Sequence, residues 1–444
     1  MTTVDDLLKK FPFPTKRESQ SGVLNQIGTA FDSGYKYILL EAPTGFGKSP
    51  VAIAAALTLD TSYICTSTKD LQAQYSRDFP FVRLAKGKNN FLCLMEDDFM
   101  RNGTKCGLDS NNAKCRHTTA DYGPCMTNES FKDRGCKYRT LLKHYKINNR
   151  GTRKEEVFID DDTRNYYQNE YSQWSHLENL KEKRLWGPCE YYHQLNIALT
   201  ASHSIFNYPM FLSLLPIKKF RSRELLILDE AHLLETEIVG FTGISISKRR
   251  WKRYIPDLKI VDYGYNDIES WIDFLNDLEK RMLDLTDIRE ELVPDAITDT
   301  EKLTRAIGDI RSNLKNWIVS EIERENNEVT KVELKPLDIS PYCKGVFEKC
   351  NKTLMMSATI LDSKTFCRSL GLPYDEVKFI QVGSDFPVQN RPIYPMGIAY
   401  LNINNLQQQE VKTKISRAID NLMTLHRNHK GLIHTTSYDQ LNFI

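Results

Sequence analysis

The sequence predicts an α/β fold in which a parallel sheet carries a nucleotide site. Two stretches, at 37–49 and 225–232, are the basis of this prediction. Each is a short apolar run, typical of a buried strand, followed by polar residues suited to phosphate or metal chemistry. The carboxyl ends of parallel strands meet at one edge of a sheet, where ligands bind. We therefore expect the two stretches to face each other across one site.

The first stretch predicts a strand, a phosphate-binding loop and a helix. Residues 37–40 are apolar, 51–59 are Ala-rich and favour a helix, and Glu-Ala-Pro-Thr-Gly-Phe-Gly-Lys-Ser occupies 41–49 between them. The glycines let backbone N–H groups surround phosphate oxygens, while Lys48 reaches the terminal phosphates and Ser49 can bind Mg²⁺. The residues predicted to contact the nucleotide here are Ala42, Pro43, Thr44, Gly45, Phe46, Gly47, Lys48 and Ser49.

The second stretch, Leu-Leu-Ile-Leu-Asp-Glu-Ala-His at 225–232, places two acids at the end of a predicted strand. Asp229 can bind Mg²⁺ through water, and Glu230 can orient or deprotonate the attacking water. We expect His232 to link the state of the nucleotide to the rest of the protein. The alternative is a strand that simply ends in an Asp helix cap, and the phosphate-loop pattern upstream argues against it.

Composition excludes some functions and leaves others open. The chain has 444 residues, 41% of them hydrophobic, and a formal net charge of +2, so any contact with nucleic acid must be a local patch. It shows no signal peptide and no apolar run near the ~20 residues of a membrane span, which favours the cytoplasm. Six of its ten cysteines lie between residues 93 and 189, in the segment that separates the two stretches. Their spacing is consistent with zinc, an iron–sulfur cluster or buried thiols.

Together these and other segments resemble the XPD/DinG family of superfamily 2 iron–sulfur DNA helicases, from residue 11 to the C-terminus. Motifs I and II are the two stretches above. The other matching segments are Phe11–Pro14 with Arg17 and Gln20 (the adenine-reading Q motif), 66–74 (motif Ia, a DNA-backbone contact), 86–93 and 189–192 (flanks of the outer cluster cysteines), 201–212, 355–360 (motif III), 384–387 with Asn390 and Arg391, and 431–438 (motif IV).

The resemblance implies a RecA-like P-loop motor domain with an inserted iron–sulfur domain and an inserted helical arch domain, followed by the start of a second RecA-like domain. Apolar residues at helical spacing from 268 to 285 and from 303 to 317 predict two packed helices within the arch. The implied boundaries are 1–85, 201–236 and 341–380 for the first motor domain, 86–200 for the cluster domain, 237–340 for the arch and 381–444 for the second motor domain.

The same resemblance implies a [4Fe–4S] cluster. Cys93 and Cys189 match the outer ligands, and Cys136 lies in a Cys-Lys-Tyr segment like that of the family. The neighbouring family cysteine is replaced by Arg139, so the fourth ligand is open. We favour Cys125, which is nearest to Cys136, over Cys106 and Cys115, and zinc in the same pocket is an alternative.

Two basic stretches are candidates for binding single strands by backbone contacts and aromatic stacking. The first, Lys143–Lys154 with Tyr138 and Tyr145, is followed at once by acidic residues, so a solvated loop explains it equally well. The second, Lys248–Tyr254, is denser and has aromatic residues within it. We therefore favour the second stretch over a solvated face.

The resulting hypothesis is an ATP-dependent DNA helicase with ATP, Mg²⁺ and a [4Fe–4S] cluster as cofactors. By resemblance it moves 5′ to 3′ on single-stranded DNA, acts on forked or tailed duplexes in DNA repair, and has no membrane association. One alternative is an ATP-binding, metal-cluster DNA-binding protein without unwinding activity. Another is a P-loop ATPase that is independent of nucleic acid, against which the matches to motifs Ia, III and IV argue.

The C-terminal region predicts a weakened motor. About 60 residues follow 380, which is few for a RecA-like sheet with its helices, and no Gln-x-x-Gly-Arg-like segment follows Tyr438. We therefore expect this chain to be truncated, to bind ATP, to hydrolyse it slowly and not to unwind duplex. We also expect strands near the C-terminus to expose an incomplete apolar face.

Overall fold

The structure is a computed structural model. It describes residues 3–91, 144–147, 153–157, 190–217, 220–288, 294–390, 392–400 and 402–444. Internal contacts divide the chain into two compact units, Met1–Ser384 and Asp385–Ile444. Across the described ranges, no helix is both long enough and apolar enough to cross a bilayer.

The first unit is built on a seven-stranded sheet in the order β12-β1-β11-β7-β2-β6-β3, and every neighbouring pair in it is parallel. This confirms the predicted α/β class, and both predicted strands are present as β1 and β7. The strands are β1 (Tyr37–Glu41), β2 (Ser62–Thr66), β3 (Arg83–Leu84), β6 (His203–Asn207), β7 (Arg223–Asp229), β11 (Cys350–Ser357) and β12 (Val377–Gln381).

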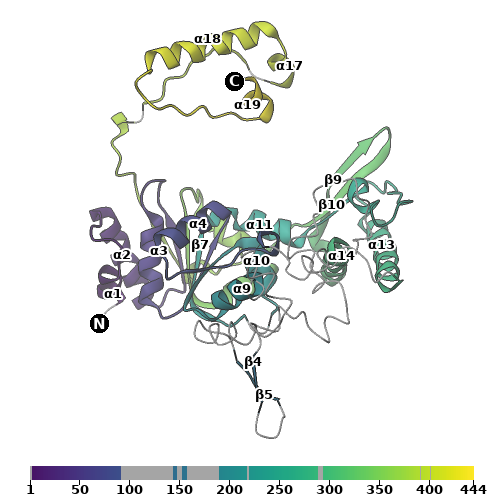
Figure 1. Cartoon of the computed structure of the whole chain (residues 1–444), viewed down its shortest axis with the longest axis horizontal. Coiled ribbons are helices and arrows are strands. Elements are labelled where there is room, and N and C mark those ends of the chain that lie inside the picture. Colours follow the sequence, from purple (N-terminus) through teal and green to yellow (C-terminus); the bar gives the residue numbers. More distant parts are fainter. Residues whose placement is uncertain are drawn as a thin grey trace, which may run out of the picture. The chain divides into compact units, whose positions relative to one another are not determined.

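Helices cover both faces of this sheet (Figure 1). Successive side chains of a strand point to opposite faces, so Ile38 and Leu40 belong to one buried cluster and Leu39 to the other. Against the first face lie α1 (Thr3–Lys9), α2 (Glu18–Asp32), α3 (Lys48–Thr58) and α4 (Lys69–Asp78). Against the second lie α9 (Glu190–Thr200), α10 (Tyr208–Leu214), α11 (Leu234–Thr242), α15 (Ser340–Phe347) and α16 (Ser363–Ser369).

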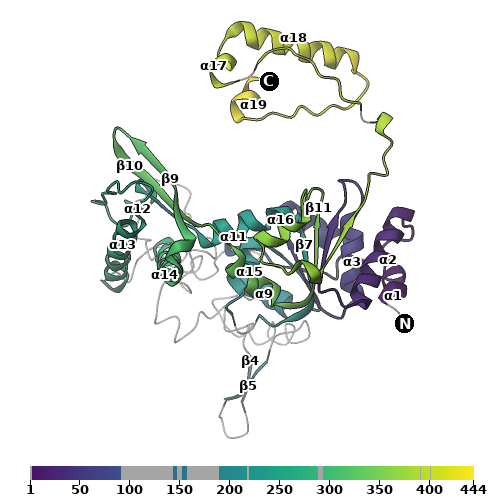
Figure 2. The ribbon, with the colours of Figure 1, turned by 180° about the vertical axis from the view of Figure 1, so that it is seen from behind.

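Residues 244–336 form a subdomain with its own apolar cluster. The predicted helices are present as α13 (Ile268–Ile288) and α14 (Pro294–Ser312), and they pack on each other through residues such as Leu275 and Ile307. The region is not purely helical, because an antiparallel sheet in the order β8-β10-β9 packs with them (Figure 2). Its other elements are β8 (Ile244–Ser247), α12 (Lys248–Trp251), β9 (Trp317–Glu325) and β10 (Glu328–Pro336).

The prediction that the second helix continues to Trp317 is wrong. The backbone leaves the helix at Asn313, which has φ −153°, and Trp317 begins β9. Along β9, Trp317 and Val319 are buried while Ile318 is exposed, which is the period of a strand. Leu314 and Trp317 therefore fit a helical spacing by chance.

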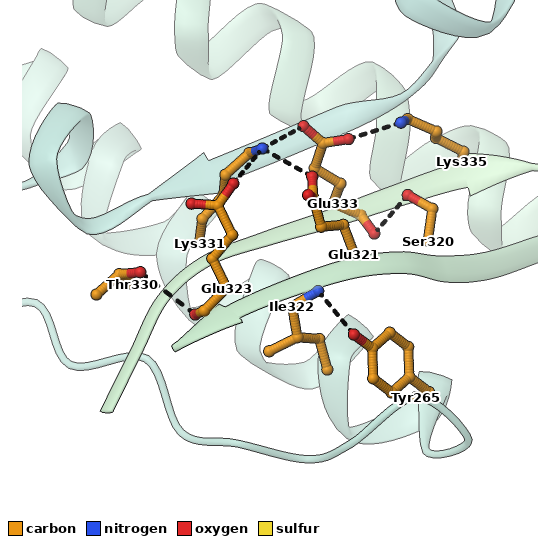
Figure 3. A network of polar contacts seen from close by, with 9 residues as sticks. All are labelled: Tyr265, Ser320, Glu321, Ile322, Glu323, Thr330, Lys331, Glu333 and Lys335. Atoms are coloured by element: carbon orange, nitrogen blue, oxygen red, sulfur yellow. Dashed lines mark hydrogen bonds and ion pairs between the residues drawn. The ribbon is translucent and has the colours of Figure 1, made fainter. Parts of the chain in front are cut away.

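Strands β9 and β10 form a hairpin closed by Asn326 and Asn327, whose φ angles of 51° and 64° suit a two-residue turn. Lys331 lies among three carboxylates (Figure 3), with Nζ 2.8 Å from Glu321, 2.8 Å from Glu323 and 2.9 Å from Glu333. The hydrogen bonds that Lys331 donates to these carboxylates raise its pKa. Because the network is at the surface, it fixes the hairpin's geometry more than it adds stability.

The second unit, Asp385–Ile444, contains α17 (Ile403–Leu406), α18 (Gln409–Leu425) and α19 (Tyr438–Phe443). The expected C-terminal strands are absent from its described residues, 385–390, 392–400 and 402–444. An isolated segment cannot form a ladder without a partner strand, and 431–436 has none there. The expected apolar exposure is present, since Leu432 is 88% and Tyr438 is 83% exposed.

Candidate nucleotide site

The phosphate loop joins β1 to α3, which begins at Lys48. Gly45 and Gly47 have φ of 79° and 84°, in the left-handed region that glycine adopts without cost. A Cβ on Gly47 would lie 2.5 Å from Nε2 of Gln20, so this position is restricted by space as well as by backbone angle. The loop is therefore shaped by its two glycines, as the motif predicts.

Arg17 and Gln20, the residues that resemble the Q motif, hold this loop. Gln20 Nε2 donates to the carbonyl of Phe46 at 3.0 Å, and its Oε1 accepts from the Arg17 backbone N–H at 2.9 Å. Arg17 Nη2 donates to the carbonyls of Gly45 and Phe46, at 2.8 and 2.6 Å. Adenine recognition by Gln20 stays a prediction. The clamping of the loop by Arg17 was not predicted, because no local pattern marks it.

The sheet brings the two predicted stretches together. Leu40 pairs with Met356, and Met356 pairs with Asp229, so the loop after β1 and the acids after β7 lie at the same edge. Lys48 Nζ donates to the carbonyl of Ala42 at 3.1 Å and lies close enough to Asp229 to affect its titration. Burial raises the pKa of the Asp229 carboxyl, while the hydrogen bond from Tyr75 and the charge of Lys48 oppose that rise.

Asp229 is only 3% exposed, and tyrosines that the sequence did not single out surround it. Its Oδ2 accepts from the Tyr75 hydroxyl at 2.9 Å, and its Oδ1 accepts from the Glu230 N–H at 3.1 Å. The Tyr208 hydroxyl donates to its main-chain oxygen at 2.9 Å. The carboxylate is thus held at both oxygens.

Glu230 and His232 continue the site beyond Asp229. Glu230 has φ 54° and ψ 46°, a left-handed conformation that costs roughly 1–2 kcal/mol for a residue with a side chain. This turn places Glu230 Oε2 3.4 Å from His232 Nδ1, which also lies 2.8 Å from the Ser357 hydroxyl at the end of β11. His232 therefore connects the acidic stretch to the segment that resembles motif III.

Glu41, the last residue of β1, connects this strand to the turn after β11 and to the end of β12. The sequence did not predict these contacts. Glu41 Oε2 accepts from the N–H groups of Ile360 and Leu361, at 2.5 and 3.1 Å, and its Oε1 accepts from Gln381 Nε2 at 2.7 Å. Burial raises the pKa of Glu41, but these hydrogen bonds outweigh it and leave the pKa below its ordinary value. Leu361 has φ 64°, which is unusual for a residue other than glycine, so the Glu41 carboxylate stabilises a turn with a left-handed residue.

The side chains present fit a magnesium ion. Mg²⁺ prefers hard oxygen ligands, and the Ser49 hydroxyl and the Asp229 carboxylate supply them. The Tyr75 hydroxyl donates to Asp229 at 2.9 Å, and Ser49 lies in the first turn of α3, at the same edge of the sheet. We find no group of three or more His, Cys, Asp or Glu arranged to hold a metal among the residues the structure describes.

The predicted cluster cysteines, Cys93, Cys125, Cys136 and Cys189, lie outside the described residues, as do Cys106 and Cys115. The cysteines that are described have buried free thiols, and burial raises the pKa of each of them. They are Cys65, Cys343, Cys350 and Cys367.

The favoured basic stretch, Lys248–Tyr254, differs from its prediction. Its aromatic residues, Trp251 and Tyr254, are core side chains that are 1% and 7% exposed, so they offer no stacking surface. Arg250 forms an ion pair with Asp299, and Lys248 forms one with Glu328. The exposed cations that remain are Arg249, Lys252 and Arg253.

The other basic stretch lies only partly in the described residues. There β4 (His144–Ile147) and β5 (Arg153–Val157) form an antiparallel hairpin in which Lys146 is opposite Glu155. Lys143, Arg150 and Tyr138 lie outside the described residues. One basic residue of β4 is thus paired with an acidic residue, and β5 itself contains both Arg153–Lys154 and Glu155–Glu156.

Fold and site together define a phosphate-loop protein with a parallel α/β sheet. No protein-family model and no curated protein matches the chain. Its structural neighbours include XPD helicases. A structure titled XPD helicase is 16% identical with a TM-score of 0.46, over 83% of this chain and 63% of that one. One titled Truncated XPD is 15% identical with a TM-score of 0.41, over 83% and 100%.

A third neighbour, titled XPD apo, is 12% identical with a TM-score of 0.37, over 89% of this chain and 65% of that one. The chain thus spans about two thirds or less of the length of the first and third neighbours. Likeness at this level carries no correspondence between residues. The roles of individual side chains therefore rest on the geometry of this chain.

Proposed function

We propose that this chain is part of an ATP-dependent DNA helicase of the XPD/DinG type, which moves 5′ to 3′ on single-stranded DNA. The observation that carries the proposal is the convergence of Lys48, Ser49 and Asp229 at the carboxyl edge of one parallel sheet, with Glu230 next in the chain. A phosphate loop and an acid pair in this arrangement suit the hydrolysis of a nucleoside triphosphate.

Each residue has a distinct role in this proposal. Lys48, at the start of α3, binds the terminal phosphates together with the backbone N–H groups of the loop. Ser49 and Asp229 hold Mg²⁺, which neutralises phosphate charge when it is bound. Glu230, whose backbone is left-handed directly after β7, orients or deprotonates the attacking water.

The contact between His232 and Ser357 supports a link between the nucleotide and the rest of the motor. In this proposal a change at Glu230 is passed to Ser357 through His232, and Ser357 lies within the segment that resembles motif III. In the proposed helicase this segment transmits the state of the nucleotide to the DNA site. Single-stranded and tailed duplex DNA are the proposed substrates, and the [4Fe–4S] cluster is proposed for the cysteines of the 93–189 insertion.

The test combines nucleotide binding, DNA binding and hydrolysis on the 444-residue chain. We expect a fluorescent ATP analogue to bind in a Mg²⁺-dependent manner, labelled single-stranded DNA to bind, and DNA to stimulate hydrolysis. Because we expect this chain not to unwind duplex, 5′-tailed and 3′-tailed duplexes test that expectation, and displacement from the 5′-tailed duplex alone would give the polarity. Binding of both ligands without stimulation would favour the ATP-dependent switch protein. Absence of nucleotide binding would refute the proposal.

A further inference from the structure

A single buried hydroxyl holds the carboxylate that we assign to magnesium. Tyr75 lies on α4 and is 1% exposed, with its ring packed against Phe79 at a centroid distance of 5.9 Å. Its hydroxyl is 2.9 Å from Asp229 Oδ2. Tyr75 therefore contacts the end of β7 from an element outside both predicted stretches.

The direction of this hydrogen bond suits a cation site. The carboxylate can only accept, so the phenol donates its proton to Asp229. Asp229 is fixed by Tyr75 at Oδ2 and by the Glu230 N–H at Oδ1, and each oxygen keeps a lone pair for a metal. The carboxylate is thus oriented before any ligand arrives.

We infer that Tyr75 is a positioning residue for magnesium, whose hydroxyl holds Asp229 in the orientation that binds Mg²⁺ with ATP. The inference rests on the proposed function, since it assumes a Mg²⁺–nucleotide site, and it adds a residue that no phosphate-loop motif contains. Outer partners that orient metal ligands commonly contribute 10-fold to 100-fold to metal affinity. Tyr75 is such a partner for Asp229.

The test is Tyr75→Phe, which removes the hydroxyl and keeps the ring in the core. Binding of a fluorescent ATP analogue is titrated with Mg²⁺, and binding without metal is measured in a chelator. We expect the half-saturating Mg²⁺ concentration to rise at least about 10-fold, with metal-free binding changed less than about twofold. An unchanged Mg²⁺ requirement in folded Tyr75→Phe would overturn the inference.

The matched control is Tyr63→Phe. Tyr63 is also fully buried on the same sheet, but its hydroxyl donates to the carbonyl of Arg221 at 2.8 Å, away from the predicted metal ligands. We expect this variant to lose stability without changing its Mg²⁺ requirement. An equal rise in both variants would show a general loss of packing and would overturn the assignment to Tyr75.

A second measurement avoids any folding defect of Tyr75→Phe. A 3-fluorotyrosine introduced at position 75 keeps the hydroxyl and reports its surroundings by ¹⁹F resonance. We expect the resonance to shift when Mg²⁺ is added to the nucleotide complex, and an unmoved resonance would contradict the inference. Failure of the unlabelled wild-type chain to bind the nucleotide at any Mg²⁺ concentration would instead refute the proposed function itself.

Discussion

Removing the carboxylate of Glu41 is expected to loosen the turn after β11 and the end of β12 together. Glu41 accepts three hydrogen bonds, from the N–H groups of Ile360 and Leu361 and from the side chain of Gln381. At about 1 kcal/mol for each net hydrogen bond, Glu41→Ala should lower the free energy of unfolding by about 3 kcal/mol. Because Glu41 is partly exposed, solvent screening reduces this loss of unfolding free energy to about 2 kcal/mol.

The isosteric change Glu41→Gln should cost less, about 1 kcal/mol. Its amide oxygen can still accept from the backbone N–H groups, and Gln381 can turn its own oxygen toward the new NH₂ group. A third variant, Glu224→Ala, is the control, since that carboxylate accepts one backbone N–H, from Asp60 at 2.9 Å. We expect the order of stability to be wild type, Glu41→Gln, then Glu41→Ala, with Glu224→Ala close to wild type.

The dependence on pH provides an independent check. The pKa of Glu41 in the folded protein lies below its ordinary value of 4.5. The stabilisation that the Glu41 carboxylate adds to the folded state is therefore fully present above pH 4.5. It is lost as the pH falls through the lower pKa of the folded protein. Urea unfolding followed by circular dichroism at pH 7 and near pH 3 measures this. The destabilisation by Glu41→Ala should shrink at the lower pH. Equal stability of the wild type, Glu41→Gln and Glu41→Ala at pH 7 would refute the role of Glu41.

Five further substitutions test the site and the insertion. Lys48→Ala should abolish nucleotide binding and leave the circular dichroism spectrum unchanged, and retained binding would contradict the assigned role. Glu230→Gln should bind ATP and reduce any hydrolysis at least about 100-fold, so unaltered turnover would exclude it as the base. Gly47→Ala should weaken nucleotide binding, because its φ of 84° and the nearby Gln20 amide leave no room for a methyl group, and wild-type affinity would show that the loop adapts. Cys93→Ser and Cys189→Ser should each remove the brown chromophore and iron while sparing ATP binding, and full iron content in both would argue against their assignment as ligands.

Local signals made the sheet edge predictable. Residues 37–49 and 225–232 each contain their own strand and polar end, so the position of Asp229 opposite Lys48 follows from parallel pairing alone. The contacts of Tyr75 with Asp229 and of Glu41 with Gln381 could not be predicted in this way. They join residues 154 and 340 positions apart, and no spacing in one sequence encodes such pairs.

The errors have physical causes as well. Trp251 and Tyr254 lie within a basic stretch, but their large apolar rings are buried in the cluster of the 244–336 subdomain while the cations around them face outward. Trp317 fits both a helical and a strand spacing, and the break at Asn313 decides between them. In both places tertiary packing overrides a local pattern.

The buried thiols make cysteine chemistry informative about the rest of the chain. Cys65, Cys343, Cys350 and Cys367 are enclosed, and burial raises the pKa of Cys343 and Cys350 to about 12 and of Cys367 to about 11. Such thiols are almost never ionised at neutral pH and react slowly with alkylating reagents. Any rapid alkylation of the native protein therefore comes from the six cysteines between 93 and 189. Counting modified sites by mass before and after metal removal would show directly how many of those six act as ligands.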